Sequence, residues 1–176
     1  MIQNLIGKKQ IFAIEYSVIS INKETAFGNC LIWLQGNSLG GLEGECYLNM
    51  ICHWLERRMK FKELLFLKDT LYNLSDVELF KYIEEKATYE ERENCFFLDT
   101  EGFDLYRNYI YRKNEYFYFL WQLDRDYWTE FEPQGISTGL FTAKVDILTY
   151  SKVVKQFKDH LLILYRSRND LRENPQ

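Results

Sequence analysis

The side chains with the most potential for chemistry are carboxylates gathered in two short stretches of the chain. The first stretch lies between residues 90 and 104, and the second is the run DRDYWTEFE, in which rings alternate with acids. Asp99 with Glu101, and Asp124 with Asp126, are two residues apart, which on a strand places both carboxylates on one side. Such pairs are candidates for acid/base catalysis, for a surface that binds a basic partner, or for a solvated acidic face.

Catalysis is the least supported of these three interpretations. The sequence has no Gly-x-Ser-x-Gly motif, and its two histidines leave few candidates for a catalytic triad, so we predict that the protein is not an enzyme. Exposed rings among carboxylates can anchor a protein partner while the charge attracts it, although a solvated acidic face remains the alternative. The residues predicted to bind a partner are Glu90, Glu91, Glu93, Asp99, Glu101, Asp124, Asp126, Tyr127, Trp128 and Glu130.

Cysteine and histidine suggest neither a metal site nor a cofactor. The cysteines are scattered, with no Cys-x-x-Cys spacing, at positions Cys30, Cys46, Cys52 and Cys95. No cluster of acids or histidines accompanies Cys52 or its neighbour His53, so buried free thiols are expected and no metal is implied. His160 lies beside Asp159 in a predicted helix and is interpreted as a surface residue.

The glycine-rich segment 36–44 is the other feature that could bind a ligand. It holds four of the nine glycines of the chain but lacks the Gly-x-x-x-x-Gly-Lys-Ser/Thr spacing of a phosphate-binding loop. Its one charge is acidic, which would repel phosphate. We therefore predict a loop of tight turns here.

The composition excludes several classes of protein. The chain has 176 residues and a net charge of -4, its pI is about 5.3, and 47% of its residues are hydrophobic, which argues against disorder and against nucleic-acid binding. Apolar runs are too short to span a bilayer, and the N-terminal sequence does not have the order of a secretory signal, so we expect a cytoplasmic protein without a membrane partner.

The charge is unevenly distributed along the chain. Residues 76–132 hold seven basic and fifteen acidic side chains, a net of -8. Residues 1–75 hold eight basic and seven acidic side chains, a net of +1, and residues 133–176 hold seven and four, a net of +3. The acidity is therefore a property of the middle of the chain.

Hydrophobic periodicity predicts which elements position these acids. Alternation predicts strands at 10–21 and 29–35, and apolar residues spaced three and four apart predict a helix at 47–59. A Ser-x-x-Glu capping box at Ser75 predicts a helix at 76–87 whose buried face includes Val77, and 61–71 is ambiguous.

The second half of the chain has the strongest strand signal. Two aromatic runs at 104–112 and 115–123 predict a hairpin whose second strand is covered on both faces. A strand at 139–147 and a helix at 149–166 follow, and 168–176 is a frayed tail. This order predicts one α+β domain over residues 1–176, with about three helices packed on an antiparallel sheet.

The N-terminal part resembles a known family. The residues that carry the resemblance are the run from Phe12 to Tyr16, Phe27-Gly28 before a strand with Trp33, Gly36, Leu39-Gly40, and the helix that begins near Tyr47. They are similar to the forty-second family of immunity proteins of bacterial polymorphic toxin systems.

The resemblance implies a protein that binds and neutralises a cognate toxin domain, without catalytic residues of its own. Because many such toxins are nucleases with basic grooves, an acidic inhibitor could occupy the groove in place of the phosphate backbone. The alternatives are an interaction or regulatory module with an unknown partner and, less favoured, a small-ligand binder or an enzyme. The oligomeric state is left open.

Overall fold

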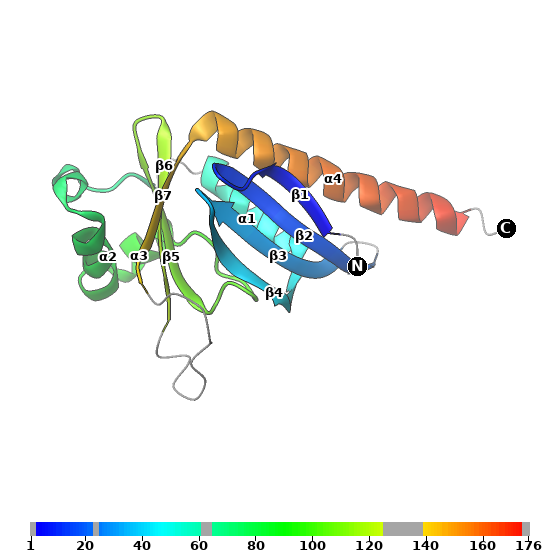
Figure 1. Ribbon diagram of the computed structural model, residues 1–176, viewed down its shortest axis with the longest axis horizontal. Coiled ribbons are helices and arrows are strands. Elements are labelled where there is room, and N and C mark those ends of the chain that lie inside the picture. Colours follow the sequence, from blue (N-terminus) through cyan, green and yellow to red (C-terminus); the bar gives the residue numbers. More distant parts are fainter. Residues whose placement is uncertain (1–2, 23–24, 61–64, 125–138, 174–176) are drawn as a thin grey trace.

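The computed structural model describes residues 3–22, 25–60, 65–124 and 139–173, although the side chains of 42–44 and 168–173 are not described. The strands form two antiparallel sheets, sheet A with the order β1-β2-β3-β4 and sheet B with the order β5-β6-β7 (Figure 1). The elements are β1 (Gln3–Lys8), β2 (Phe12–Ile21), β3 (Ala26–Leu34), β4 (Asn37–Tyr47), α1 (Leu48–Lys60), the 3-10 helix η2 (Asp69–Asn73), α2 (Asp76–Glu85), α3 (Tyr89–Cys95), β5 (Tyr106–Lys113), β6 (Tyr116–Leu123), β7 (Phe141–Asp146) and α4 (Ile147–Glu173).

The α+β class predicted from the element order is confirmed, with two sheets where one was expected. The strands predicted at 10–21 and 29–35 correspond to β2 and β3, which are antiparallel neighbours. Strand β1 was not predicted, because its half-exposed, mixed sequence QNLIGK has little alternation. It adds an outer strand to sheet A by pairing with β2.

The glycine-rich segment is a strand, and the predicted loop is wrong. Residues 37–47 form β4, the outer strand beside β3, and only the turn at Gln35-Gly36 precedes it. Gly40 has a φ of +99°, and a Cβ atom there would lie 2.7 Å from the Phe103 ring. Glycine therefore lets an edge strand bend closely over a buried ring, a need that appears only when the strand and the ring are placed together.

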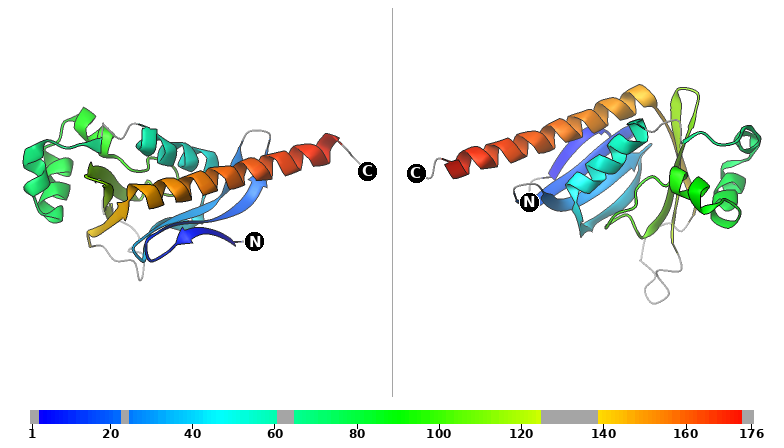
Figure 2. Two further views of the ribbon diagram at one scale, coloured as in Figure 1. Left: turned by 90° about the horizontal axis from the view of Figure 1, so that it is seen from above. Right: turned by 180° about the vertical axis from the view of Figure 1, so that it is seen from behind.

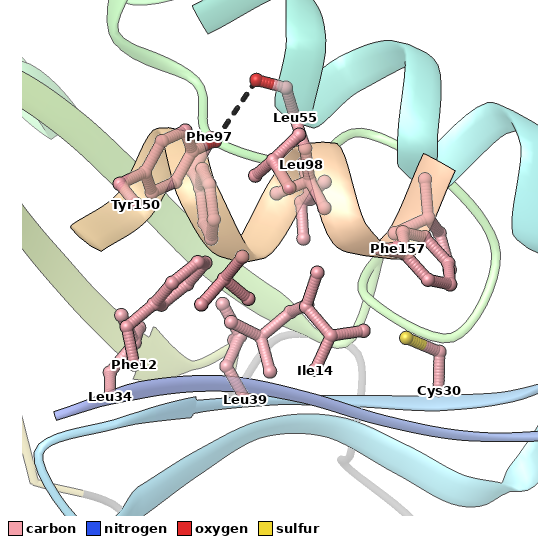
Figure 3. Packing of buried hydrophobic residues seen from close by; sticks show 14 of the residues in the cluster. Phe12, Ile14, Cys30, Leu34, Leu39, Leu55, Phe97, Leu98, Tyr150 and Phe157 are labelled. Atoms are coloured by element: carbon pink, nitrogen blue, oxygen red, sulfur yellow. Dashed lines mark hydrogen bonds between the residues drawn. The ribbon is translucent and has the colours of Figure 1, made fainter. Parts of the chain in front are cut away.

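Helices α1 and α4 lie on one face of sheet A, where they bury the main core (Figure 2). Tyr150 of α4 is fully buried, with its ring centroid 4.9 Å from that of Phe12 in sheet A and 4.9 Å from that of Phe117 in sheet B. Its hydroxyl donates a hydrogen bond of 3.1 Å to the carbonyl of Leu55 in α1 (Figure 3). One ring thus contacts both sheets and both helices.

Helix α4 begins two residues before its predicted start and continues to Glu173, beyond its predicted end at 166. Its predicted apolar stripe is buried at Val153, Val154, Phe157 and Leu161. His160 is half-buried and forms a hydrogen bond with the Tyr16 hydroxyl, so its interpretation as a surface residue is wrong.

Within the described ranges, no helix combines the length and apolar character needed to cross a membrane.

Sheet B carries the aromatic hairpin as predicted, with β6 at its centre and both faces covered. Phe117, Phe119 and Trp121 face the main core. Leu120 faces a second cluster of buried residues, which α2 and α3 cover. The aromatic content of this hairpin is therefore used in packing on both sides of one strand.

Two short helices form the outer layer on sheet B. The capping box that begins α2 at Ser75 is present, but Val77 is 66% exposed and Leu79 is buried in its place. Helix α3 was not predicted, although Thr88 and Glu91 form a second capping box at its start. Its sequence YEERENC has no apolar stripe, so periodicity could not reveal it.

All four cysteines are buried and free, as predicted. Burial raises the pKa of Cys52 and of Cys95 to about 11. At neutral pH these groups are thiols inside the core rather than nucleophiles or metal ligands.

The two neighbouring leucines Leu161 and Leu162 provide a matched test of the α4 interface. Leu161 is 3% exposed and Leu162 is 43% exposed. We expect Leu161→Ala to lower the free energy of unfolding by about 2–5 kcal/mol, because it leaves a cavity between α4 and sheet A. Leu162→Ala should change it by about 0.5 kcal/mol or less. Equal losses in urea denaturation would contradict the observed orientation of the helix.

The buried tyrosines make stability dependent on alkaline pH. Burial raises the pKa of Tyr16, Tyr109 and Tyr150, so these groups stay neutral in the fold. In the unfolded chain they ionise near pH 10, so their contribution to the free energy of unfolding is constant below about pH 10 and falls as the pH rises further. Absorbance of tyrosinate should therefore rise for these rings only together with loss of the circular dichroism signal. Ionisation well before unfolding would contradict the prediction.

Candidate functional site

The predicted binding residues fall into three groups in the structure. Glu90, Glu91 and Glu93 lie on α3, Asp99 and Glu101 lie in the turn that follows it, and Asp124 lies directly after β6. The remaining predicted residues lie outside the described residues, and they are Asp126, Tyr127, Trp128 and Glu130.

A groove of about 400 Å³ brings two of the predicted acids together. Asp99 and Asp124 are distant in sequence, but both line this groove between α2–α3 and strand β5. Two acids that sequence reasoning did not assign to the site, Glu84 and Asp104, line it as well, with Arg92 and Arg107. The groove is therefore polar, with four carboxylates and two guanidinium groups.

Arg107 organises the charges inside the groove. Its Nη1 lies 2.5 Å from Glu84 Oε2, and its Nε lies 3.0 Å from Asp124 Oδ2. The hydrogen bond to Asp124 is the main cause of its raised pKa, and Glu84 adds to it. Glu84 also accepts a hydrogen bond from the Tyr109 hydroxyl, whose pKa is raised first by burial and then by this bond. The cation thus holds α2 against sheet B.

The helix α3 is held in place by two arginines. Arg92 donates hydrogen bonds to the carbonyls of Ile83 (3.1 Å) and Glu84 (2.5 Å), which end α2. Arg58 of α1 is 3% exposed and reaches the carbonyl of Asn94 at 3.4 Å. Both arginines satisfy carbonyls at helix ends, where the helix dipole favours a cation.

Asn108 fixes the turn that carries Asp99. It is buried in β5, and its side chain accepts from Leu98 N at 2.8 Å and donates to Leu98 O at 3.0 Å. An amide that bonds both backbone groups of one residue acts as a strand partner. Sequence reasoning missed Asn108 and Arg107, because their partners are distant in sequence. Only the folded structure brings these partners within hydrogen-bond distance.

The acids divide into those that pair with cations inside the fold and those without an ion-pair partner among the described residues. Glu91 caps α3 and lies 2.6 Å from Lys68, and Asp124 pairs with Arg107, so both are structural. Five acids have no ion-pair partner among the described residues, namely Glu90, Glu93, Asp99, Glu101 and Asp104. Among the residues that the structure describes, no group of three His, Cys, Asp or Glu residues could hold a metal ion.

The site is an α+β surface that presents carboxylates without ion-pair partners among the described residues, and no catalytic constellation has been described on it, which is compatible with a protein that binds another protein. Residues 1–160 match the family described as immunity protein 42, and the chain belongs to this family. It is accordingly an immunity protein, which binds and neutralises a cognate toxin. The family decides against the alternative of a regulatory module with an unrelated partner.

A solved structure supports the fold. The chain is similar to the crystal structure of CdiI from Burkholderia dolosa AUO158, with a TM-score of 0.59 and 12% sequence identity. The similarity covers 89% of this chain and 99% of that one. None of the curated proteins matches the sequence.

Replacing Arg107 tests whether the groove depends on its central cation. Arg107→Met removes the cation that pairs with both Glu84 and Asp124, and we expect a loss of about 1–2 kcal/mol in the free energy of unfolding. The loss is modest because the Arg107 side chain is 37% exposed. Lys81→Met is the control, since its pair with Glu85 is long and exposed, and it should leave stability unchanged. If both variants unfold at the wild-type urea concentration, Arg107 does not hold this layer together.

Proposed function

We propose that this immunity protein binds its toxin through the acidic surface formed by α3, the turn 98–104 and the adjoining groove. The observation that carries the proposal is the set of five carboxylates on this surface without an ion-pair partner among the described residues. Free carboxylates held on a fixed frame need little rearrangement to meet cations of a partner, so little of the binding energy goes into ordering them.

The charge distribution supports an electrostatic approach of the toxin to this surface. Residues 84–104 hold eight acidic and two basic side chains. The basic segment 133–176 contains α4, which extends away from α2 and α3 (Figure 1). Negative charge is therefore concentrated at one end of the molecule, and a basic partner is drawn toward that end before contact.

We propose further that the toxin is a nuclease. An enzyme that cleaves nucleic acid lines its substrate groove with Lys and Arg side chains, which contact phosphates. Carboxylates spread over a helix and a turn offer these cations an alternative to the phosphate backbone. On this proposal neutralisation is occupation of the groove, no catalysis by the immunity protein is involved, and it takes place in the cytoplasm.

Charge-neutral substitutions test the surface. The variant Asp99→Asn/Asp104→Asn should associate with the cognate toxin domain about three- to tenfold more slowly at low ionic strength. The control Glu115→Gln/Asp159→Asn removes the same charge on the β5–β6 hairpin and on α4, and should associate at the wild-type rate. The difference should shrink as salt is added, because screening shortens the range of the field. Equal rates for both variants at low ionic strength would refute the proposed surface.

Competition with substrate tests the class of toxin. A catalytically inactive toxin variant should bind either a labelled nucleic acid or the immunity protein, but not both, because each occupies the same basic groove. Fluorescence anisotropy of the nucleic acid should therefore fall as immunity protein is added. A stable ternary complex, or a toxin without affinity for nucleic acid, would rule out the groove-occupying mechanism.

A further inference from the structure

A second cavity borders α3 and is lined by other residues of this helix than the acidic groove is. It has a volume of about 190 Å³ and is lined mainly by apolar residues, which include Leu71, Ile83, Ala87 and Cys95. Glu91, Asn94 and Cys95 of α3 line this cavity, whereas Arg92 of the same helix lines the groove. One helix of seven residues thus borders both an apolar pocket and an acidic groove.

The pocket has the size and the rim of a site for a single apolar side chain. Its volume is below the roughly 300–1000 Å³ of sites for small-molecule ligands. Phe66, which is 50% exposed, forms part of its wall, and the ion-paired Lys68 and Glu91 line it as well. An apolar interior surrounded by polar groups is the usual form of an anchor pocket at a protein interface.

The surface beside the pocket restricts what can enter it. Tyr89 on α3 is 81% exposed, and the exposed Glu90 and half-buried Glu93 of the same helix have no ion-pair partner among the described residues. A segment that crosses α3 between pocket and groove therefore meets negative charge. Charge complementarity requires basic residues on that segment next to the side chain that enters the pocket.

We propose that the pocket receives an apolar side chain of the toxin, flanked by the basic residues that the groove and α3 bind. The inference builds on the proposed function, since it takes the toxin as the partner that contacts α3. In this arrangement the acids attract and orient the toxin by charge, which salt screens. The pocket adds an apolar contact, which salt does not screen. The toxin is then bound at both the groove and the pocket.

Two variants test the proposed pocket, one that fills it and one that opens it. Ala87→Leu places extra side-chain volume in the pocket, and Phe66→Ala removes an exposed part of its wall. Each should weaken binding of the cognate toxin domain at least about tenfold, mainly through faster dissociation, at high as well as low ionic strength. Val77→Leu is the control, because Val77 is on α2, 66% exposed, and does not line the pocket. Thermal unfolding of each variant shows whether its fold is retained.

The outcomes separate this inference from the proposed function. Wild-type affinity in both pocket variants, with slower association of Asp99→Asn/Asp104→Asn, would overturn the pocket and leave the acidic surface standing. Weaker binding of the pocket variants with no effect of the charge variants would retain the pocket and overturn the acidic surface. If wild type self-associates in sedimentation experiments and Ala87→Leu abolishes this, the pocket belongs to a second copy and the proposal is wrong.

Discussion

The packing of Tyr150 is the interaction on which the rest of the structure depends. Its ring contacts Phe12 of sheet A and Phe117 of sheet B, and its hydroxyl satisfies the Leu55 carbonyl of α1. A fully buried tyrosine must have a hydrogen-bond partner, so its position fixes the approach of α1 as well as the angle between the sheets. The inner face of each sheet needs side chains from another element to bury it. The first turns of α4 supply these side chains to both sheets.

This arrangement leaves the outer face of sheet B for the acidic layer. Helices α2 and α3 rest on the aromatic surface of β5 and β6, where the second cluster of buried residues supports them. Arg107, Arg92 and Arg58 bind carboxylates and carbonyls of neighbouring elements, so the acids that remain exposed are held on a fixed frame. The same layer thus contains cations that hold its elements together and exposed carboxylates without an ion-pair partner among the described residues.

Local signals explain which elements could be predicted from the sequence. The aromatic hairpin, the capping box at Ser75 and the stripe of α4 depend on residues close in sequence, and each is present. Strand β4 was missed because its glycines indicate turns until its pairing with β3 and its contact with Phe103 are known. Helix α3 was missed because it has no apolar stripe of its own and is held by its caps, by its own Arg92 and by Arg58 of α1.

The same distinction applies to the site and defines what each level decided. The sequence by itself determined the α+β class, the buried thiols, the acidic middle of the chain and the resemblance to the immunity family, because these follow from composition and short patterns. Only the tertiary structure decided which acids are available. It brought Asp99 and Asp124 into one groove, paired Asp124 and Glu91 with cations, and formed an apolar pocket that borders α3 as the groove does. Charge is a property of the residues, but whether a charge is neutralised depends on partners that only folding brings within reach.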